Sequence, residues 1–138
     1  GRKDTFNESP NVVHLSSADP YDPGLRQIAL EEAEKLGIKT HDGGTVVVVN
    51  GPRFSTRPES RLVALMGAAV VHMTQYPEGY LCLEKGIPVV NIALITDYDA
   101  GLEGRPDIKP VQAEDVVRVL EDNNDRVKQL IFKMIERI

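Results

Sequence analysis

The stretch TVVVVNGPRFSTRPESRLVALMGAAVVHMTQYPE, from Thr45 to Glu78, decides the fold class of this 138-residue chain. Its pattern reads strand, loop, helix, strand, loop. The run Thr45–Val49 is uninterrupted and β-branched, which is typical of a strand covered on both faces of an α/β sheet. The run Ala69–Met73 predicts a second strand, and both strands end in polar loops. Ligands of open α/β sheets bind at that edge, so the two loops are the first place to look for a site.

The helix between these strands is predicted from its capping residues. Thr56 and Glu59 form a T-x-x-E capping box, in which each side chain bonds the other residue's backbone amide. Gly67 is expected to end the helix, because glycine adopts the left-handed conformation of a helix C-terminus without strain. The residues that we expect to face inward are Leu62, Val63 and Met66.

Three further helices are predicted by the same signals. Asp22 followed by Pro23 indicates a helix start, and Gly37 indicates the end of that helix. Pro77 is expected to open a third helix that ends at Gly86, and a final helix runs from about residue 112 to the C-terminus. The stripe that traces one face of the final helix comprises Val116, Leu120, Asn123, Val127, Leu130, Met134 and Ile138.

A third strand is predicted over Pro88–Ile95, PVVNIALI, and a short strand-like run begins at Val12. The order helix, glycine, apolar run occurs three times, at LGI, MGA and KGI. This alternation favours an α/β fold with at least partly parallel strands. We therefore expect a single domain with a central mixed β-sheet flanked by helices.

Composition excludes several classes of protein. The net charge of −5 and the lack of a basic cluster disfavour nucleic acid as a partner. No run approaches the roughly 18–20 apolar residues of a membrane span, so no membrane partner is expected. Cys82 stands alone, which suits a reducing, cytoplasmic location. His14, His41 and His72 lack metal-ligand spacing, so no metal site is expected.

Polar residues follow all three predicted strands. The set that these three ends place near one edge comprises Phe54, Ser55, Met73, Thr74, Asp97 and Asp99. It contains no nucleophile–base pair and suits an aromatic heterocycle with an anion better than covalent chemistry. Each member also has a structural interpretation. Phe54 can fill a loop, Ser55 can cap a helix, Met73 can belong to the core, and aspartates after a strand often form turns.

The segments GPRFSTRPE, MTQYPE and TDYD together resemble the trimeric purine nucleoside phosphorylase family, in its methylthioadenosine-cleaving branch. The resemblance spans nearly all of residues 1–138 and matches the C-terminal half of such an enzyme. It implies a pentosyltransferase of purine and methionine salvage. The reaction is phosphorolysis of S-methyl-5′-thioadenosine to adenine and methylthioribose 1-phosphate. Inorganic phosphate is the co-substrate, and no cofactor is expected.

The resemblance assigns roles to the residues at the three predicted strand ends. Phe54 packs on the purine, Met73 lies under the ribose, and the hydroxyl of Thr74 donates to phosphate. Asp97 is the catalytic carboxyl and meets N7 and the 6-amino group, while Asp99 helps to hold the purine loop. A protonated Asp97 could donate to N7 as the base leaves, which would need a pKa raised by burial and by Asp99.

Two departures from the guanosine- and inosine-cleaving branch indicate adenine. That branch has Glu where this chain has Ser55, and Asn where it has Asp97. A hydroxyl can donate to the bare N1 of adenine, and a carboxylate can accept from its amino group. A 6-oxopurine or methylthioinosine phosphorylase, or a non-catalytic binding or assembly module, remains the alternative.

The resemblance also implies contacts beyond the base. Ala113 and Val117, four residues apart on one helix face, match the wall around the methylthio group, and the small Ala113 leaves the preference for methylthio over hydroxyl open. His14 is the candidate for a contact with the neighbouring subunit's nucleoside, which implies a homo-oligomer, a trimer or hexamer. The chain opens GRKDTFNESP, and the family's glycine-rich phosphate loop and Arg–His pair are not recognised in it. We expect residues 1–138 to be the C-terminal part of a single phosphorylase domain whose N-terminal half supplies them.

Overall fold

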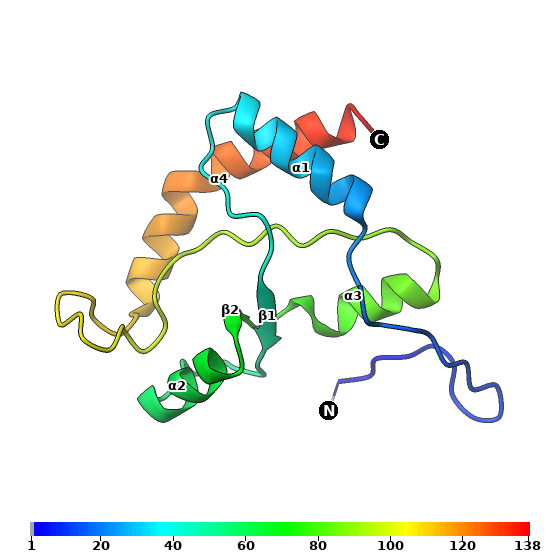
Figure 1. Cartoon of the computed structure of the whole chain (residues 1–138), viewed down its shortest axis with the longest axis horizontal. Coiled ribbons are helices and arrows are strands. Elements are labelled where there is room, and N and C mark those ends of the chain that lie inside the picture. The colour runs from blue at the N-terminus through cyan, green and yellow to red at the C-terminus, as the bar shows by residue number, and fades with distance from the viewer. Residues whose placement is uncertain (1) are drawn as a thin grey trace.

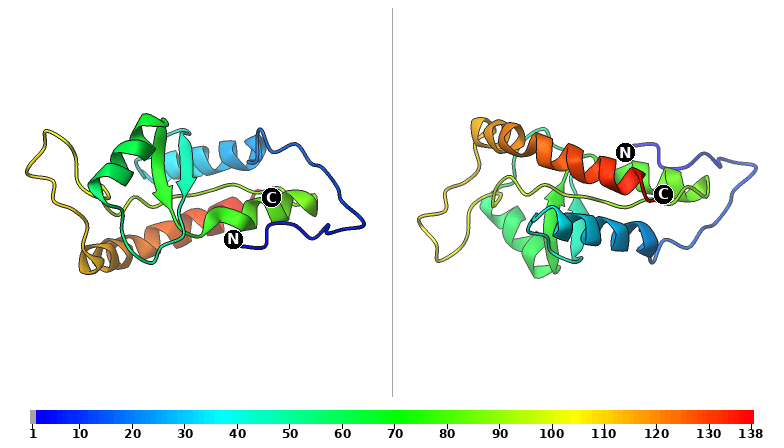
Figure 2. Two further views of the ribbon diagram at one scale, coloured as in Figure 1. Left: turned by 90° about the horizontal axis from the view of Figure 1, so that it is seen from below. Right: turned by 90° about the horizontal axis from the view of Figure 1, so that it is seen from above.

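A computed structural model describes residues 2–138 as four helices around a small parallel sheet (Figure 1). The elements in chain order are α1 (Pro23–Lys35), β1 (Thr45–Val48), α2 (Arg57–Leu65), β2 (Ala68–His72), α3 (Gln75–Glu84) and α4 (Ala113–Ile135). Helix α2 connects β1 to β2, which are paired in parallel. Helices α1 and α4 pack together and lie above the chain segment that follows α3 in the view of Figure 1, whereas this segment runs between them in the views of Figure 2. The predicted α/β class is confirmed.

The predicted starts of α1 and α2 are confirmed by single hydrogen bonds. Asp22 Oδ1 accepts from the backbone N of Leu25 at 2.7 Å, so it caps α1. Thr56 caps α2, and both halves of its capping box with Glu59 are present. Glycines follow α1, α2 and α3 with positive φ, as predicted, because an L-residue would be strained there.

The sheet of residues 2–138 contains β1 and β2 alone. Val46 lies opposite Val70 and Val48 opposite His72, and the ladder continues as Val49 N donates to His72 O at 2.8 Å. Because the strands are parallel, the loops that follow them leave from the same edge of the sheet. The sequence had predicted that these two loops carry the site.

Two predicted strands are wrong. Residues 88–95 and the run that begins at Val12 have no strand structure. The apolar run Pro88–Ile95 crosses the molecule as extended chain, and its Val89 O accepts one bond, from Asp22 N at 2.8 Å. A strand requires a neighbour that pairs with successive backbone groups, and nothing in the described part of the chain lies beside this run in that way.

The core of residues 2–138 is small and lies between α1 and α4. Ala33, Leu130 and Met134 are buried there. The partly buried residues packed on them are Ile28, Ala29, Leu36, Ile38 and Val90. Of the predicted α4 stripe, Leu130 and Met134 are buried, whereas Leu120 and Ile138 are exposed. Helix α1 therefore covers only the part of α4 around Leu130 and Met134.

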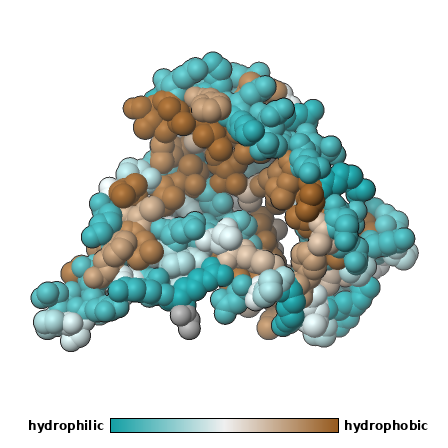
Figure 3. Space-filling model, turned by 180° about the vertical axis from the view of Figure 1, so that it is seen from behind, coloured by the Kyte–Doolittle hydropathy of each residue, from teal (hydrophilic) through white to brown (hydrophobic). Residues whose placement is uncertain are grey.

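Much apolar surface is open to solvent (Figure 3). The accessible surface of 10142 Å² exceeds the about 7,100 Å² that a compact chain of 15.2 kDa exposes. Leu62 and Met66 of α2 are 59% and 65% exposed, so the prediction that they face inward is wrong for the described chain. The helix has an apolar face, but no element of residues 2–138 covers it.

Candidate functional site

The loop after β1 lies directly against the residue that follows β2. Gly51 has a φ of 62°, and a Cβ built on it would lie 2.6 Å from Met73 Sδ. Glycine suits this position for two reasons: a left-handed backbone strains other residues, and a Cβ would force the Met73 side chain to move. The contact places the start of the Phe54–Ser55 loop beside Met73, as the parallel strand ends predict.

An ion pair braces this loop against α2. The guanidinium of Arg53 donates to Glu59 Oε2 at 2.9 Å and to Oε1 at 2.7 Å, and also to the carbonyl of Phe54 at 3.1 Å. The pKa of Glu59 is held below its ordinary value, first by Arg53 and then by the bonds from Thr56. Arg53 is therefore committed to holding the loop. Phe54 itself is 39% exposed, and Ser55 is half-buried.

The turn between β2 and α3 carries Thr74. The Nδ1 of His72 accepts from the backbone N of Thr74 at 3.3 Å and of Gln75 at 3.1 Å. Tyr76 has non-helical backbone angles, because the ring of the following proline clashes with a preceding residue in the α conformation. The regular part of α3 therefore begins at Pro77, as predicted. Thr74 is exposed at the tip of this turn.

A cavity of about 280 Å³ lies beside this turn. It is lined from the turn by His72 and Thr74 and from the crossing segment by Asn91 and Ile92. The other residues that line it are Gln75, Glu78, Gly79, Val89 and Val90. The crossing segment thus brings residues 89–92, which precede Asp97 and Asp99 in the chain, next to the turn that carries Thr74.

Asp97 and Asp99 form a compact acidic turn after the crossing segment. Asp97 accepts from the Thr96 hydroxyl at 2.6 Å and from the backbone N of Asp99 at 2.7 Å. Asp99 has a positive φ of 51°, and its Oδ2 is buried with no hydrogen-bond partner within residues 2–138. An unpaired buried carboxylate oxygen is costly, so this atom indicates a place where a hydrogen-bond donor is needed.

The acidic turn is tied to the start of α4. Val111 N donates to Asp99 O at 2.9 Å, shortly before Ala113 begins the helix. Ala113 and Val117 are both exposed, and so is His14 in the segment before α1. The structure therefore links Asp99 to the helix that carries the predicted 5′ wall. Neither the cavity beside the turn nor the second cavity, between α1 and α4, is lined by Phe54, Asp97 or Asp99. The convergence of these residues on one base stays a prediction.

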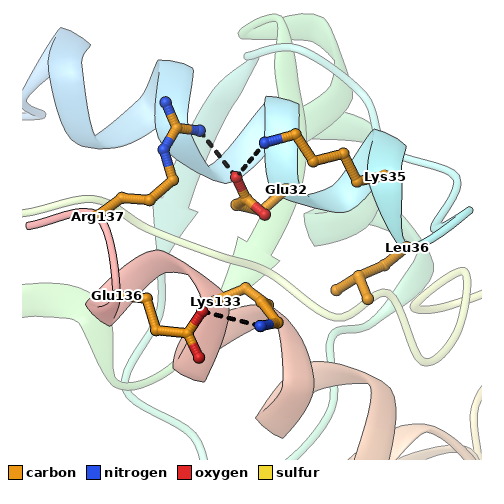
Figure 4. Close-up of a pocket in the computed structure, with 6 residues that line it drawn as sticks. All are labelled: Glu32, Lys35, Leu36, Lys133, Glu136 and Arg137. Atoms are coloured by element: carbon orange, nitrogen blue, oxygen red, sulfur yellow. Dashed lines mark hydrogen bonds and ion pairs between the residues drawn. The ribbon is translucent and has the colours of Figure 1, made fainter.

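The second cavity, of about 460 Å³, lies between α1 and the C-terminal end of α4 (Figure 4). Its polar wall is an ion-pair cluster. Glu32, 5% exposed, accepts from Lys35 at 2.6 Å and from Arg137 at 2.9 Å, and Lys35 is the larger cause that lowers its pKa. Arg137 also pairs with Glu31 at 2.8 Å. With its cations already paired, the cluster fastens α4 to α1.

Within residues 2–138, no group of three or more His, Cys, Asp or Glu side chains is arranged to hold a metal ion. None of the helices in that range combines the length and apolar character that a membrane span requires.

Three features of the site were not predicted from the sequence. They are the Arg53–Glu59 brace, the Gly51–Met73 contact and the bonds to His72 Nδ1. The only sequence signal for the second was the Asn50–Gly51 dipeptide, which is typical of a turn. The brace and the His72 bonds depend on side-chain conformations that no short motif specifies.

Comparison with known proteins identifies the family. Residues 1–136 match the model described as "Phosphorylase superfamily". The chain belongs to the phosphorylase superfamily. The S-methyl-5′-thioadenosine phosphorylase of Thermofilum pendens is 45% identical over 138 residues, and that of Pyrococcus abyssi is 44% identical over 137. These alignments cover 100% and 99% of this phosphorylase-superfamily chain but 51% of each relative, so the chain spans about half their length.

Solved structures agree with the phosphorylase-superfamily assignment. Methylthioadenosine phosphorylase from Schistosoma mansoni in complex with adenine superposes with a TM-score of 0.87 at 29% identity, covering 99% of this chain and 54% of that one. The same enzyme in complex with tubercidin superposes with a TM-score of 0.84 at 29% identity, covering 99% and 53%.

Proposed function

We propose that this chain is part of an enzyme that cleaves S-methyl-5′-thioadenosine by phosphorolysis. A phosphate oxygen bonds to C1′ while the C1′–N9 bond breaks, and the bonding electron pair leaves with adenine. The products are adenine and methylthioribose 1-phosphate. The observation that carries the proposal is the buried Oδ2 of Asp99, which has no hydrogen-bond partner within residues 2–138 and lies beside Asp97, in a chain whose relatives are named for this reaction.

The acidic turn is proposed to bind the amino edge of adenine. The 6-amino group is a donor, and the free oxygen of Asp99 lacks one within residues 2–138. Asp97, whose oxygens already accept from Thr96 and Asp99, is proposed to face N7 and to deliver the proton that the departing base takes up. Ser55 supplies the hydroxyl for N1, where the Glu of the 6-oxopurine branch would repel adenine.

The other contacts follow the three strand ends. Phe54 is proposed to pack on the purine. Met73, whose sulfur lies close to Gly51, is proposed to lie under the ribose. Thr74 is proposed to bind phosphate with its hydroxyl. Positioning of reactants and stabilisation of charge on the departing base are the contributions that such a reaction requires. Ala113 and Val117 are proposed to line the 5′ pocket.

One threonine is a poor phosphate site by itself. We propose that the remaining phosphate ligands belong to the part of the relatives' length that this chain does not match, as the N-terminal half of the same domain. The exposed apolar side chains, in a chain whose total accessible surface is 10142 Å², support a covering segment of this kind. We further propose a homo-oligomer, a trimer or hexamer, in which His14 reaches the neighbouring subunit's nucleoside. The reaction as proposed uses no cofactor.

The test is a phosphorolysis assay of the complete gene product. Methylthioadenosine, adenosine, methylthioinosine and inosine are compared with and without phosphate. We expect phosphate-dependent release of adenine and preference for the adenine nucleosides by about 10⁴, because a site built around hydrogen-bond donors and acceptors rejects mismatched bases strongly. Equal turnover of inosine, or adenine release without phosphate, would overturn the assignment.

A matched variant tests the base-recognition step separately. Ser55→Glu introduces the acceptor of the 6-oxopurine branch, so adenine nucleosides should lose turnover relative to inosine. Ser55→Ala is the control, since it removes the donor without adding repulsion. If the two variants behave alike, Ser55 does not select against 6-oxopurines in the proposed way.

A further inference from the structure

The two threonines at helix N-caps in the proposed site behave differently. The hydroxyl of Thr56 accepts from Glu59 N at 3.4 Å and donates to Glu59 Oε2 at 2.8 Å, so it is fully engaged in capping α2. Thr74 occupies the N-cap position of α3, but in the described chain its side chain makes no capping hydrogen bond. The third residue after Thr74 is Pro77, which has no N–H, so the bond that the Thr56 hydroxyl accepts from its third following residue has no counterpart at Thr74.

His72 closes the turn instead. Its Nδ1 accepts from the backbone N of both Thr74 and Gln75. A ring nitrogen that accepts two N–H groups carries no proton, so the neutral ring holds its proton on Nε2. The imidazole reaches the two amides from the end of β2, outside the turn itself. The turn is thus closed without using the hydroxyl at its tip.

We propose that His72 is a positioning residue that holds the turn on which the Thr74 hydroxyl meets phosphate. The inference rests on the proposed function, because it assigns His72 a role at the same site. Without the imidazole, the backbone amides of Thr74 and Gln75 lose their acceptor, so the turn no longer holds Thr74 in one place. Thr74 then binds phosphate more weakly, because a side chain that must be ordered on binding contributes less to affinity.

His72 also lines the cavity that Thr74 lines, so a direct contact with ligand is the competing role. A double-mutant cycle separates the two, since a residue that acts through Thr74 has no effect once the Thr74 hydroxyl is gone. In the complete gene product, His72→Ala is expected to raise the KM for phosphate on the order of tenfold and to leave the KM for nucleoside within about twofold. Adding His72→Ala to Thr74→Ala should change little, and additive losses in the double variant would overturn the proposal.

Two substitutions separate the acceptor atom from the shape of the ring. His72→Phe keeps a flat ring but offers no acceptor, so it should behave like His72→Ala. His72→Asn places an amide oxygen near the position of Nδ1 and should recover most of the phosphate affinity. A wild-type KM for phosphate in His72→Phe would contradict the role given to Nδ1.

A second measurement, hydrogen exchange, tests the role of His72 without depending on enzymatic activity. Hydrogen–deuterium exchange of the complete protein should be faster over residues 73–77 in His72→Phe than in wild type, because two amides lose their acceptor. Unchanged exchange would overturn the role of His72. Wild-type protein that cleaves no nucleoside would instead overturn the proposed function and leave the exchange result standing.

Discussion

Arg53 and Glu59 are joined by two parallel N–H···O bonds, of 2.9 and 2.7 Å, across the first turn of α2. The same carboxylate accepts from the backbone N of Thr56 at 2.7 Å, and the same guanidinium donates to the carbonyl of Phe54. One ion pair therefore fixes a loop to a helix start. Since Phe54 and Ser55 lie within that loop, the geometry of the proposed purine site depends on residues that need not touch the purine.

Removing the capping hydroxyl tests the helix end of this arrangement. We expect Thr56→Ala to lower the free energy of unfolding by about 1 kcal/mol, the usual cost of losing an N-cap oxygen. Thr56→Ser retains the oxygen and serves as the control. Denaturant unfolding of the complete gene product, with hydrogen exchange over residues 57–61, measures the effect, and equal loss in both variants would contradict the assignment.

Acidification tests the same ion pair. The pKa of Glu59 lies below its ordinary value of 4.5 in the folded chain, chiefly because of Arg53. The stabilisation is therefore fully present above the ordinary pKa and is lost as the pH falls through the folded value. The difference in thermal midpoint between wild type and Glu59→Gln should be constant from pH 7 to 5 and shrink below about 4.5. High salt should reduce it, because the pair is exposed.

Two glycine substitutions separate steric contact from backbone strain. Gly51 and Gly67 have φ of 62° and 79°, but only at Gly51 would a Cβ meet another side chain, Met73 Sδ at 2.6 Å. In both alanine variants the left-handed backbone should lower the free energy of unfolding by about 1–2 kcal/mol. Gly51→Ala should lose more stability than Gly67→Ala and should also raise the KM for nucleoside, because Met73 must move. Equal effects in unfolding and kinetics would argue against the contact.

Asp97→Asn tests the proposed acid. The amide preserves size, but it has no dissociable proton to give to N7, so kcat for methylthioadenosine should fall by roughly 10²–10⁴ while nucleoside binding changes much less. Inosine cleavage by the same variant is the internal comparison. Unchanged kcat for methylthioadenosine would remove Asp97 from the mechanism.

The cluster between α1 and α4 gives a prediction about stability alone. Glu32 is buried between Lys35 and Arg137, whereas Glu34 is exposed on the same helix. Glu32→Gln removes the carboxylate that pairs with Lys35 and one of the two that pair with Arg137, so it should lower the thermal midpoint clearly more than Glu34→Gln does. Neither variant should change the KM for phosphate, and a change in Glu32→Gln would connect this cluster to the site.

Local features of the fold could be predicted because local chemistry determines them. The caps at Asp22 and Thr56 and the stop at Gly37 each need only neighbours within a few residues, and all three are present. The run Pro88–Ile95 reads as a strand, yet a strand also needs a pairing partner, which composition and periodicity do not reveal. For the same reason the apolar face of α2 was predicted to be inside, although nothing in the described chain covers Leu62.

Of the candidate site, the relation between two of its loops could be predicted, whereas the convergence of its residues on one base stays a prediction. Parallel strands bring their ends to one edge, and the Gly51–Met73 contact agrees with that expectation. The alternative that aspartates after a strand form turns is also realised, since Asp97 accepts from the backbone of Asp99. The function of His72 could not be deduced from its position, because capping by an imidazole depends on a rotamer that the sequence does not specify.

The parallel pair β1–β2 leaves one side of each strand without a partner in residues 2–138. The run Val46–Val49 is uncharged, β-branched and free of proline, so an open edge there invites strands from other molecules. During renaturation, correct closure of the sheet should therefore compete with the addition of strands from other molecules. Its yield should decrease steeply with protein concentration, and charged substitutions at the rim of the sheet should restore it.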